Sequence, residues 1–226
     1  MIAFGVAITD ESTYRRLAAP GLERAVEPGS LVMARRGRPS IQAAYNEMLD
    51  VAARLPGLEA LVLLHQDLEI RGDHFAERVR HVLADDRVAI VGAIGARGVR
   101  TIAWWEGTES VGQIAAPLLL REPQALGTPV QSPETVDAVD GSLLALSPWA
   151  VRHLRLDPGY APLHGYDVDL CFEARRRGRL VAVTNLDLGH HSTHGIRDRN
   201  GWVRGYLRFA RKWRVPDSPP PARRSP

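Results

Sequence analysis

Three polar clusters in this 226-residue chain have the residue types of a metal or acid–base site. They are residues 65–67 (His-Gln-Asp), 165–169 (Gly-Tyr-Asp-Val-Asp) and 190–194 (His-His-Ser-Thr-His). A divalent cation that bridges a diphosphate needs a carboxylate and accepts imidazole, which Asp67 and a histidine of the third cluster would supply. Asp167, at the start of an expected helix, could take a proton from a hydroxyl nucleophile. The combination favours a site where a metal-bound diphosphate meets a general base.

Each cluster also has a purely structural interpretation, which we favour for any one of them alone. Asp67 would be a turn acid, Asp167 a helix N-cap and His190 a hydrogen-bonded surface histidine. Asp169 lies two residues beyond Asp167 and does not share its helix face, so we expect a structural role for it at the helix start. Only the combination of the three clusters predicts chemistry.

The first cluster follows the apolar run Leu61-Val62-Leu63-Leu64. This run is short for a helix and too hydrophobic for a surface strand, so it predicts a central parallel strand over residues 59–64, buried on both faces. Ligands bind outside the carboxyl ends of such strands, which is where Asp67 would lie.

Strands and helices alternate through the first 91 residues, which predicts right-handed crossovers and an α/β fold with a Rossmann-like, mostly parallel central sheet flanked by helices. The other expected strands are 2–8, 30–34 and 88–91. The expected helices are 13–26, broken at Pro20-Gly21, then 41–55 with Ser40 as N-cap, and 73–84.

The alternation fails at residues 92–133, which predict a small loop-rich insertion or antiparallel excursion. Order returns at 135–146, around Asp140 and Gly141. A helix over 167–177, a final strand over 180–188 and a basic helix over 198–214 follow. We expect one domain over residues 1–214 and a disordered, Pro-rich tail at 215–226.

The composition excludes several classes of protein. The net charge is only +3, and the basic residues are spread along the chain without a nucleic-acid-reading motif, so no nucleic-acid partner is expected. The single cysteine, Cys171, excludes an internal disulfide, and we place it in the core. Neither a signal peptide nor a transmembrane segment is expected, which predicts a cytoplasmic protein.

The order of these motifs resembles the inverting family-2 glycosyltransferases of the GT-A fold, and within them the streptomycin-biosynthesis-type branch. The resemblance covers about residues 2–195 and is most specific over 165–191. Its motifs are Ser-Ile-Gln-Ala-Ala-Tyr-Asn at 40–46, His-Gln-Asp at 65–67, Asp-Gly-Ser at 140–142, Gly-Tyr-Asp-Val-Asp-Leu-Cys at 165–171, Arg-Arg-Arg-Gly at 175–178 and His-His at 190–191.

The resemblance implies transfer of a sugar, with inversion, from a nucleotide-sugar donor to an acceptor hydroxyl, using Mn²⁺ or Mg²⁺. The acceptor would be a saccharide, lipid-linked or a small molecule. Asp167 matches the catalytic base of the family's Glu-Asp pair. The implied metal residues are Asp67, His190 and His65, where His65 stands in place of the first acid of Asp-X-Asp. The implied nucleotide-sugar residues are Thr9, Asp10, Asn46, Gln66, Asp140 and Gly141.

The chain departs from the family pattern at three places. His65 replaces an acid, Tyr166 replaces the glutamate of Glu-Asp, and the Asp-Asp-Gly-Ser loop after the second strand is missing. His65 and Tyr166 are the best support for one alternative, a noncatalytic nucleotide- or sugar-binding protein of the same fold. A nucleotidyltransferase is the other alternative, although no Gly-rich basic loop follows the first strand.

Three surface features remain open to more than one interpretation. Trp104 and Trp105 either stack on a sugar ring or alternate inward and outward in a strand. The aromatic helix at 202–213 either covers the sheet or another subunit, as in a homodimer, or contacts anionic lipid, which would place the protein peripherally at a membrane. The arginines at 35, 36 and 38 assist the diphosphate or, as we favour, form a solvated loop.

Overall fold

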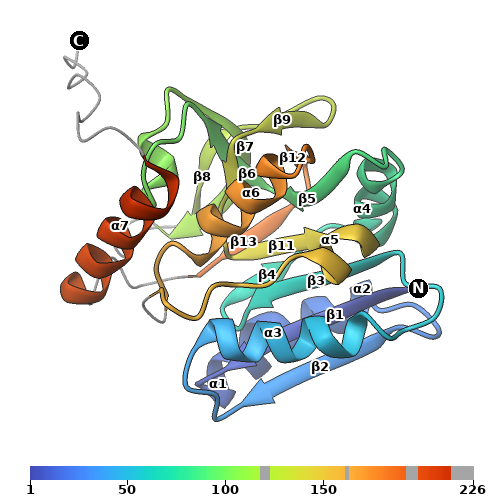
Figure 1. Cartoon of the computed structure of the whole chain (residues 1–226). Coiled ribbons are helices and arrows are strands. Elements are labelled where there is room, and N and C mark those ends of the chain that lie inside the picture. The colour runs from blue at the N-terminus through green and yellow to red at the C-terminus, as the bar shows by residue number, and fades with distance from the viewer. Residues whose placement is uncertain (118–122, 161–162, 192–197, 215–226) are drawn as a thin grey trace.

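The computed structural model describes residues 1–117, 123–160, 163–191 and 198–214. Within them, a seven-stranded sheet and a six-stranded sheet share the core (Figure 1). The larger sheet has the order β2 (Leu31–Arg36), β1 (Ile2–Ile8), β3 (Ala60–His65), β11 (Leu143–Leu146), β5 (Val88–Gly92), β12 (Leu180–Val183) and β9 (Glu134–Val136). All of these strands except β11 and β9 run in one direction, so the predicted mostly parallel sheet is confirmed.

β3 lies at the centre of this sheet, and residues 60–64 are fully buried, as predicted. The expectation that it is a parallel strand holds for its neighbour β1 but is wrong for β11, which is antiparallel. The reason is the direction from which the chain returns. It re-enters the sheet through Ser142, whose carbonyl accepts a hydrogen bond from the His65 N–H at 2.9 Å, so β11 starts at the carboxyl end of β3.

Helices cover both faces of the larger sheet. α3 (Ile41–Ala52), α5 (Pro148–His153) and α6 (Tyr166–Arg176) lie on the near face in Figure 1, and α4 (Phe75–Leu83) lies behind it. Ser40 caps α3 as predicted, through its hydroxyl and the Ala43 N–H at 3.1 Å.

The predicted break at Pro20-Gly21 is wrong. The chain stays helical from α1 (Glu11–Thr13) through a π-helical turn (Tyr14–Ala18) into α2 (Ala19–Ala25). Pro20 has no N–H to donate and occupies the first turn of α2, while the Ala19 N–H reaches back to the Tyr14 carbonyl. The wider turn therefore accommodates the proline without ending the helix.

The excursion predicted over residues 92–133 supplies three strands of the second sheet, β6 (Ile94–Arg97), β7 (Glu109–Pro117) and β8 (Pro123–Thr128). The sheet has the order β10 (Ala138–Val139), β6, β7, β13 (Leu188–His190) and β4 (Leu68–Ile70), with β8 paired to β7. The predicted single strand over 180–188 is wrong, because the chain leaves the first sheet after Val183 and enters the second at Leu188. Asp187, with φ of +50°, makes the turn between them.

The last helix, α7 (Arg199–Trp213), packs its aromatic side on α6. Phe209 is buried, and the rings of Phe209 and Trp213 both contact Phe172. The aromatic side of this helix therefore packs on another helix, α6, and not on the sheet as one interpretation predicted. The predicted disordered tail lies outside the described residues. Within the described part of the chain, no helix has the length and apolar character needed to cross a membrane.

Candidate active site

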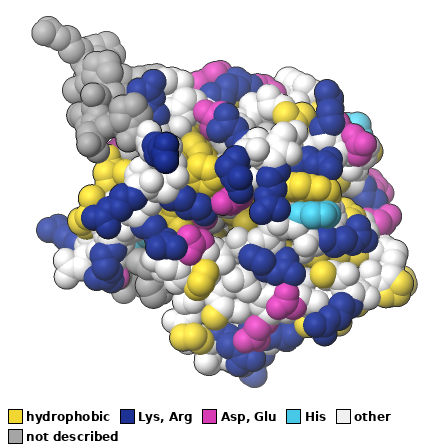
Figure 2. Space-filling model, in the orientation of Figure 1, with side chains coloured by type: hydrophobic (Ala, Val, Ile, Leu, Met, Phe, Trp, Pro, Cys, Tyr) yellow, Lys and Arg dark blue, Asp and Glu magenta, His cyan; other side chains and the backbone are white. Residues whose placement is uncertain are grey.

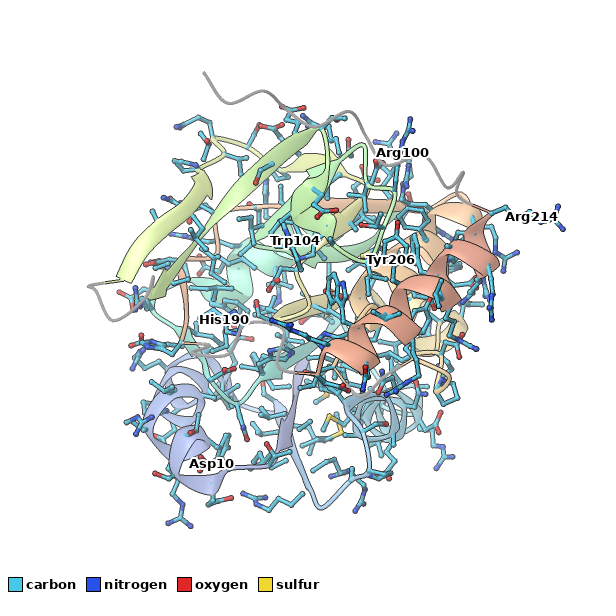
Figure 3. All side chains as sticks on the ribbon, turned by 90° about the vertical axis from the view of Figure 1, so that its left-hand side faces the viewer. Asp10, Arg100, Trp104, His190, Tyr206 and Arg214 are labelled. Carbon is cyan, nitrogen blue, oxygen red and sulfur yellow. The ribbon has the colours of Figure 1, made fainter. Side chains whose placement is uncertain are left out.

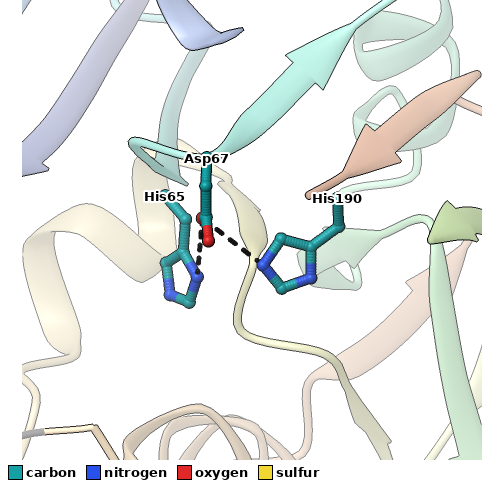
Figure 4. Close-up of side chains that lie close together, drawn as sticks. All are labelled: His65, Asp67 and His190. Carbon is teal, nitrogen blue, oxygen red and sulfur yellow. Dashed lines mark ion pairs between the residues drawn. The ribbon is translucent and has the colours of Figure 1, made fainter. Parts of the chain in front are cut away.

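His65, Asp67 and His190 come together at the edge where the two sheets meet (Figure 4). His65 ends β3, Asp67 lies in the turn between β3 and β4, and His190 ends β13. Asp67 Oδ1 is 3.9 Å from His65 Nδ1 and 3.4 Å from His190 Nε2. One ligand atom from each residue lies within 4.8 Å of the others, so the three predicted metal residues can reach a common point.

Tyr166 determines how His65 faces this point. The Tyr166 hydroxyl donates to the Gly141 carbonyl at 2.8 Å and lies 2.7 Å from His65 Nε2. Because the hydroxyl has one hydrogen, directed at Gly141, it accepts from a protonated His65 Nε2. Burial and the neighbouring His190 lower the pKa of His65, which keeps the ring neutral. Its Nδ1 then carries a lone pair and faces Asp67, as a metal ligand requires.

The other two members of the group also suit a cation. Burial raises the pKa of Asp67, but His190 and His65 outweigh it and bring the value to about 2, so Asp67 is ionised. The Nε2 atom of His190 is buried and, apart from the Asp67 carboxylate at 3.4 Å, has no polar partner within the described chain. A bound cation would satisfy this atom. Two imidazoles with one carboxylate match Mn²⁺ better than Mg²⁺, which prefers oxygen ligands.

Asp167 lies in the first turn of α6, where the helix dipole favours a negative charge. Its Oδ2 accepts the Gly141 N–H at 2.9 Å. Burial and the nearby Asp140 carboxylate raise the pKa of Asp167 to about 7. A carboxylate with that pKa is a stronger base than an ordinary aspartate at neutral pH.

Gly141 joins Asp167 to the histidine side of the site. A Cβ atom at Gly141 would lie 2.5 Å from the Tyr166 hydroxyl oxygen and 2.9 Å from the Asp167 Cβ. Both distances are too short for a side chain. A glycine is therefore required where the β10–β11 turn meets the start of α6.

Asp140 precedes this glycine and is held in place by two hydrogen bonds. Its Oδ1 accepts the Ser142 N–H at 3.0 Å, and its Oδ2 accepts the Trp104 indole N–H at 3.2 Å. Trp104 is buried in a short 3₁₀ helix (Trp104–Glu106), so the predicted strand alternation of the two tryptophans is wrong. The chain turns too tightly at Gly107, whose N–H bonds to the Trp104 carbonyl, for an extended conformation.

Three of the predicted nucleotide-sugar residues meet at the carboxyl ends of β1 and β3. Gln66 Oε1 accepts the N–H groups of Thr9 (2.8 Å) and Asp10 (2.9 Å), and its Nε2 donates to the Thr9 hydroxyl. Asp10 in turn caps α1. The fourth, Asn46, clamps α3 to the chain after α5, because its side-chain amide makes two hydrogen bonds with the Leu156 backbone.

The histidine run divides by position. His190 belongs to the group with Asp67, whereas His191 pairs with Glu69 at 3.1 Å, and His194 lies outside the described residues. Sequence reasoning missed the roles of Tyr166 and Trp104 as supports for His65 and Asp140. The sequence did contain a signal for the contact between Tyr166 and His65, because both residues replace acids of the family pattern.

On the face shown in Figure 2, basic side chains are spread out and interspersed with acidic ones. The three arginines near the second strand are paired with glutamates. Arg36 bonds to Glu11 at 2.8 Å, and Arg38 and Arg35 lie 2.7 and 3.5 Å from Glu47. These pairs agree with the favoured interpretation of a surface role.

Comparisons with known proteins agree with the motif resemblance. The model of a family described as "Glycosyltransferase like family" matches residues 7–203. The streptomycin biosynthesis protein StrF of Streptomyces griseus is 31% identical over 217 residues, which cover 94% of this chain and 75% of StrF.

Two solved structures have a similar fold at low identity. The mannosyltransferase PcManGT from Pyrobaculum calidifontis, in complex with GDP-Man and Mn²⁺, has a TM-score of 0.56 at 13% identity, covering 97% of this chain and 66% of that one. Protein A197 from STIV has a TM-score of 0.51 at 9% identity, covering 88% of this chain and 97% of that one.

Proposed function

Because this chain belongs to the glycosyltransferase-like family and has the GT-A fold, it is a glycosyltransferase, and we propose that it transfers a sugar from a nucleotide-sugar to an acceptor hydroxyl with inversion. The observation that carries the proposal is that two functional groups meet at one turn. Tyr166 links His65 of the candidate metal group to Gly141, and the Gly141 N–H binds Asp167.

In the proposed reaction, Asp167 takes the proton of the acceptor hydroxyl. The acceptor oxygen forms a bond to the anomeric carbon from the face opposite the diphosphate. The bond from that carbon to the diphosphate oxygen breaks, and its electron pair leaves with the nucleoside diphosphate. A Mn²⁺ or Mg²⁺ ion held by His65, Asp67 and His190 would offset the charge developing on that leaving group. Thr9, Asp10 and Gln66 would face the nucleotide.

The proposal is tested by assaying a panel of nucleotide-sugars for hydrolysis and transfer, with and without Mn²⁺. We expect turnover of at least one donor only with the metal. The Asp167→Asn variant should lose about 100-fold or more of the turnover and keep nucleotide binding, because only the base is removed. Asp86→Asn, an exposed aspartate, is the matched control. Full turnover by Asp167→Asn would exclude it as the base.

The metal group is tested by binding rather than by rate. Asp67→Ala and His190→Ala should each weaken Mn²⁺-dependent binding of a nucleoside diphosphate, measured by calorimetry, while the exposed His81→Ala should not. If both site variants bind the nucleoside diphosphate with unchanged affinity, Asp67 and His190 do not hold a metal that binds the nucleotide. Nucleotide binding without turnover of any donor in the panel would instead support a noncatalytic protein.

We also propose where the protein works. We propose a cytoplasmic location, with the outer face of α7, where Val203 and Leu207 are exposed, as the surface that contacts membrane lipid. A lipid-linked acceptor would then lie beside the enzyme.

A further inference from the structure

A cavity of about 250 Å³ opens beside His190 and Asp140. Its walls come from the second sheet and from the two tryptophans. The described lining residues are Ile94, Trp104, Trp105, Ser110, Ile114, Ala116, Leu126, Gly127, Asp140 and His190. Most of these side chains are apolar, and the two ionisable ones belong to the candidate reaction centre.

The rim of the cavity exposes large apolar side chains. Trp105 is 51% exposed and Leu126 is 39% exposed. Trp105 is not loose, because its ring stacks on Trp202 of α7, with ring centres 5.5 Å apart and an angle of 29° between the planes. Apolar surface that is exposed and held rigid is suited to bind an apolar group at low entropic cost.

The floor of the cavity reaches the reacting groups. Asp140 is adjacent to Gly141, whose N–H binds Asp167. Trp104 lines the cavity and donates its indole N–H to Asp140. A molecule seated in the cavity would therefore lie against Asp140 and His190, one residue along the chain from the Gly141 N–H that binds the proposed base.

The cavity is a poor match for the donor. A nucleoside diphosphate is polar and anionic, and an apolar wall would leave its phosphate oxygens without partners. The polar end of the site, at Thr9, Asp10 and Gln66, lies elsewhere. In Figure 3, His190 appears between Asp10 on one side and Trp104 on the other. The donor and the cavity's occupant would thus approach the metal group from different directions.

We propose that this cavity binds the acceptor, and that the acceptor carries an apolar aryl or alkyl group next to the hydroxyl that reacts. This inference rests on the proposed function, because it identifies the second substrate of the same site. It assigns Trp105 and Leu126 as specificity-determining residues and Trp202 as the residue that positions Trp105.

The test measures binding of three probes that share one sugar and differ in their apolar group: methyl, phenyl and hexyl β-D-glucopyranoside. Calorimetry is done on the full chain with Mn²⁺ and a nucleoside diphosphate present. We expect phenyl and hexyl glucoside to bind about tenfold or more tightly than methyl glucoside, as burial of roughly 60 Å² of apolar surface would give. The same affinity for all three probes would overturn the proposal.

Variants locate the binding. Leu126→Asn should remove most of the preference for the apolar probes, and Ala116→Phe, which fills the cavity instead of making it polar, should do the same. Val32→Asn is the matched control, since Val32 is also 39% exposed but lies on β2, away from the cavity. A preference that survives both cavity variants, or that Val32→Asn also removes, would contradict the assignment.

Donor hydrolysis in the same samples separates the two proposals. The unmodified chain and Val32→Asn, whose substitution lies on β2 outside the cavity, should hydrolyse the nucleotide-sugar with Mn²⁺ at the same rate. Intact hydrolysis with no preference among the probes overturns the acceptor assignment alone. A chain that hydrolyses no donor overturns the proposed function, and with it the acceptor assignment.

Discussion

His65 and Tyr166 are the two positions where this chain departs most from the family's acidic motifs, and they contact each other. The 2.7 Å contact between His65 Nε2 and the Tyr166 hydroxyl places the lone pair of His65 on Nδ1, toward Asp67. A histidine in place of an acid is therefore compatible with metal binding, provided that its ring is oriented by a neighbour. The two departures act as one unit.

Tyr166→Phe tests this unit. The variant keeps the ring but leaves the His65 Nε2–H without its acceptor, so His65 should turn or change tautomer. We expect Mn²⁺ affinity to fall about 10-fold or more, measured by calorimetry without substrate. Tyr14→Phe, which changes a partly buried tyrosine at the other end of the chain, is the control. Equal affinity in Tyr166→Phe and the unmodified chain would show that His65 is oriented without the hydroxyl.

Asp167 has a cost for stability that depends on pH. Its pKa is raised from 3.8 to about 7 in the folded chain, by burial and by Asp140. Between these values the unfolded chain has lost the proton and the folded chain still holds it, so stability falls as pH rises from about 4 to 7. Asp167→Asn removes this loss.

The stabilisation by Asp167→Asn should therefore be larger at pH 8 than at pH 5, measured as the difference in unfolding free energy from urea titrations. A base at this position also predicts that kcat/KM rises with pH up to about 7 and then levels. A stability difference that is equal at both pH values would mean that the carboxyl is not destabilised by burial.

At the scale of elements, Asp169 joins α7 to α6. Its side chain is 1% exposed and accepts hydrogen bonds from Tyr160 (3.0 Å), Lys212 (2.8 Å) and Trp213 (2.9 Å). The predicted structural role of Asp169 at the helix start agrees with these contacts, but the partners from α7 were not foreseen. They come from residues more than 40 positions along the chain, which no local pattern can indicate.

Asp169→Ala should lower the free energy of unfolding by about 3 kcal/mol, because it removes a buried carboxylate that accepts three hydrogen bonds, one from the buried Tyr160 and two from partly buried donors. This value lies at the low end for a broken buried pair, since Lys212 keeps Glu173 at 3.1 Å. Urea titration followed by tryptophan fluorescence measures the loss, and Asp50→Ala, which breaks an exposed pair with Arg155, is the control. An equally small loss of unfolding free energy in Asp169→Ala and Asp50→Ala would contradict the proposal that Asp169 holds α7 against α6.

The elements that sequence reasoning predicted correctly are those with local signals. β3, α3, α4 and β5 follow from apolar runs, periodicity and the Ser40 cap, and all occur within a few residues of their predicted bounds. The failures need information from elsewhere in the chain. The change of sheet between β12 and β13 depends on β4 and β7 as partners, and the π-helical turn before Pro20 depends on packing against β4.

At the scale of the molecule, motif order predicted which residues meet but not how they meet. Asp67 and His190 were expected to lie in one site because the family pattern requires it, and in the structure Asp67 Oδ1 lies 3.4 Å from His190 Nε2. The excursion was predicted, but the strands with which it pairs were not, since the pairings join residues 68–70, 94–97, 109–117 and 188–190. The second sheet supplies the wall of the cavity, so the residues proposed to bind the acceptor could not be predicted from the sequence.

The outer face of α7 leads to a prediction about the whole molecule. Val203, Tyr206 and Leu207 are 54%, 40% and 47% exposed, which is unusual for three large apolar residues on one helix. Arg211 and Arg214 follow them at the C-terminal end of the helix, and neither has an ion pair within the described chain. An apolar stripe bordered by unpaired arginines matches the surface of an anionic membrane. Trp105 of the cavity rim packs on Trp202 of the same helix, so a membrane bound here would lie beside the acceptor cavity.

We therefore expect the full chain to sediment with phosphatidylcholine vesicles that contain phosphatidylglycerol, less with phosphatidylcholine alone, and less at high salt, because salt screens the arginines. The double variant Val203→Ser, Leu207→Ser should lose most of this binding while keeping donor hydrolysis, and Val32→Ser should keep both. Equal sedimentation of the double variant would exclude α7 as the contact. Loss of a dimer in the double variant, seen by size-exclusion chromatography without vesicles, would instead assign this face to a second copy of the chain.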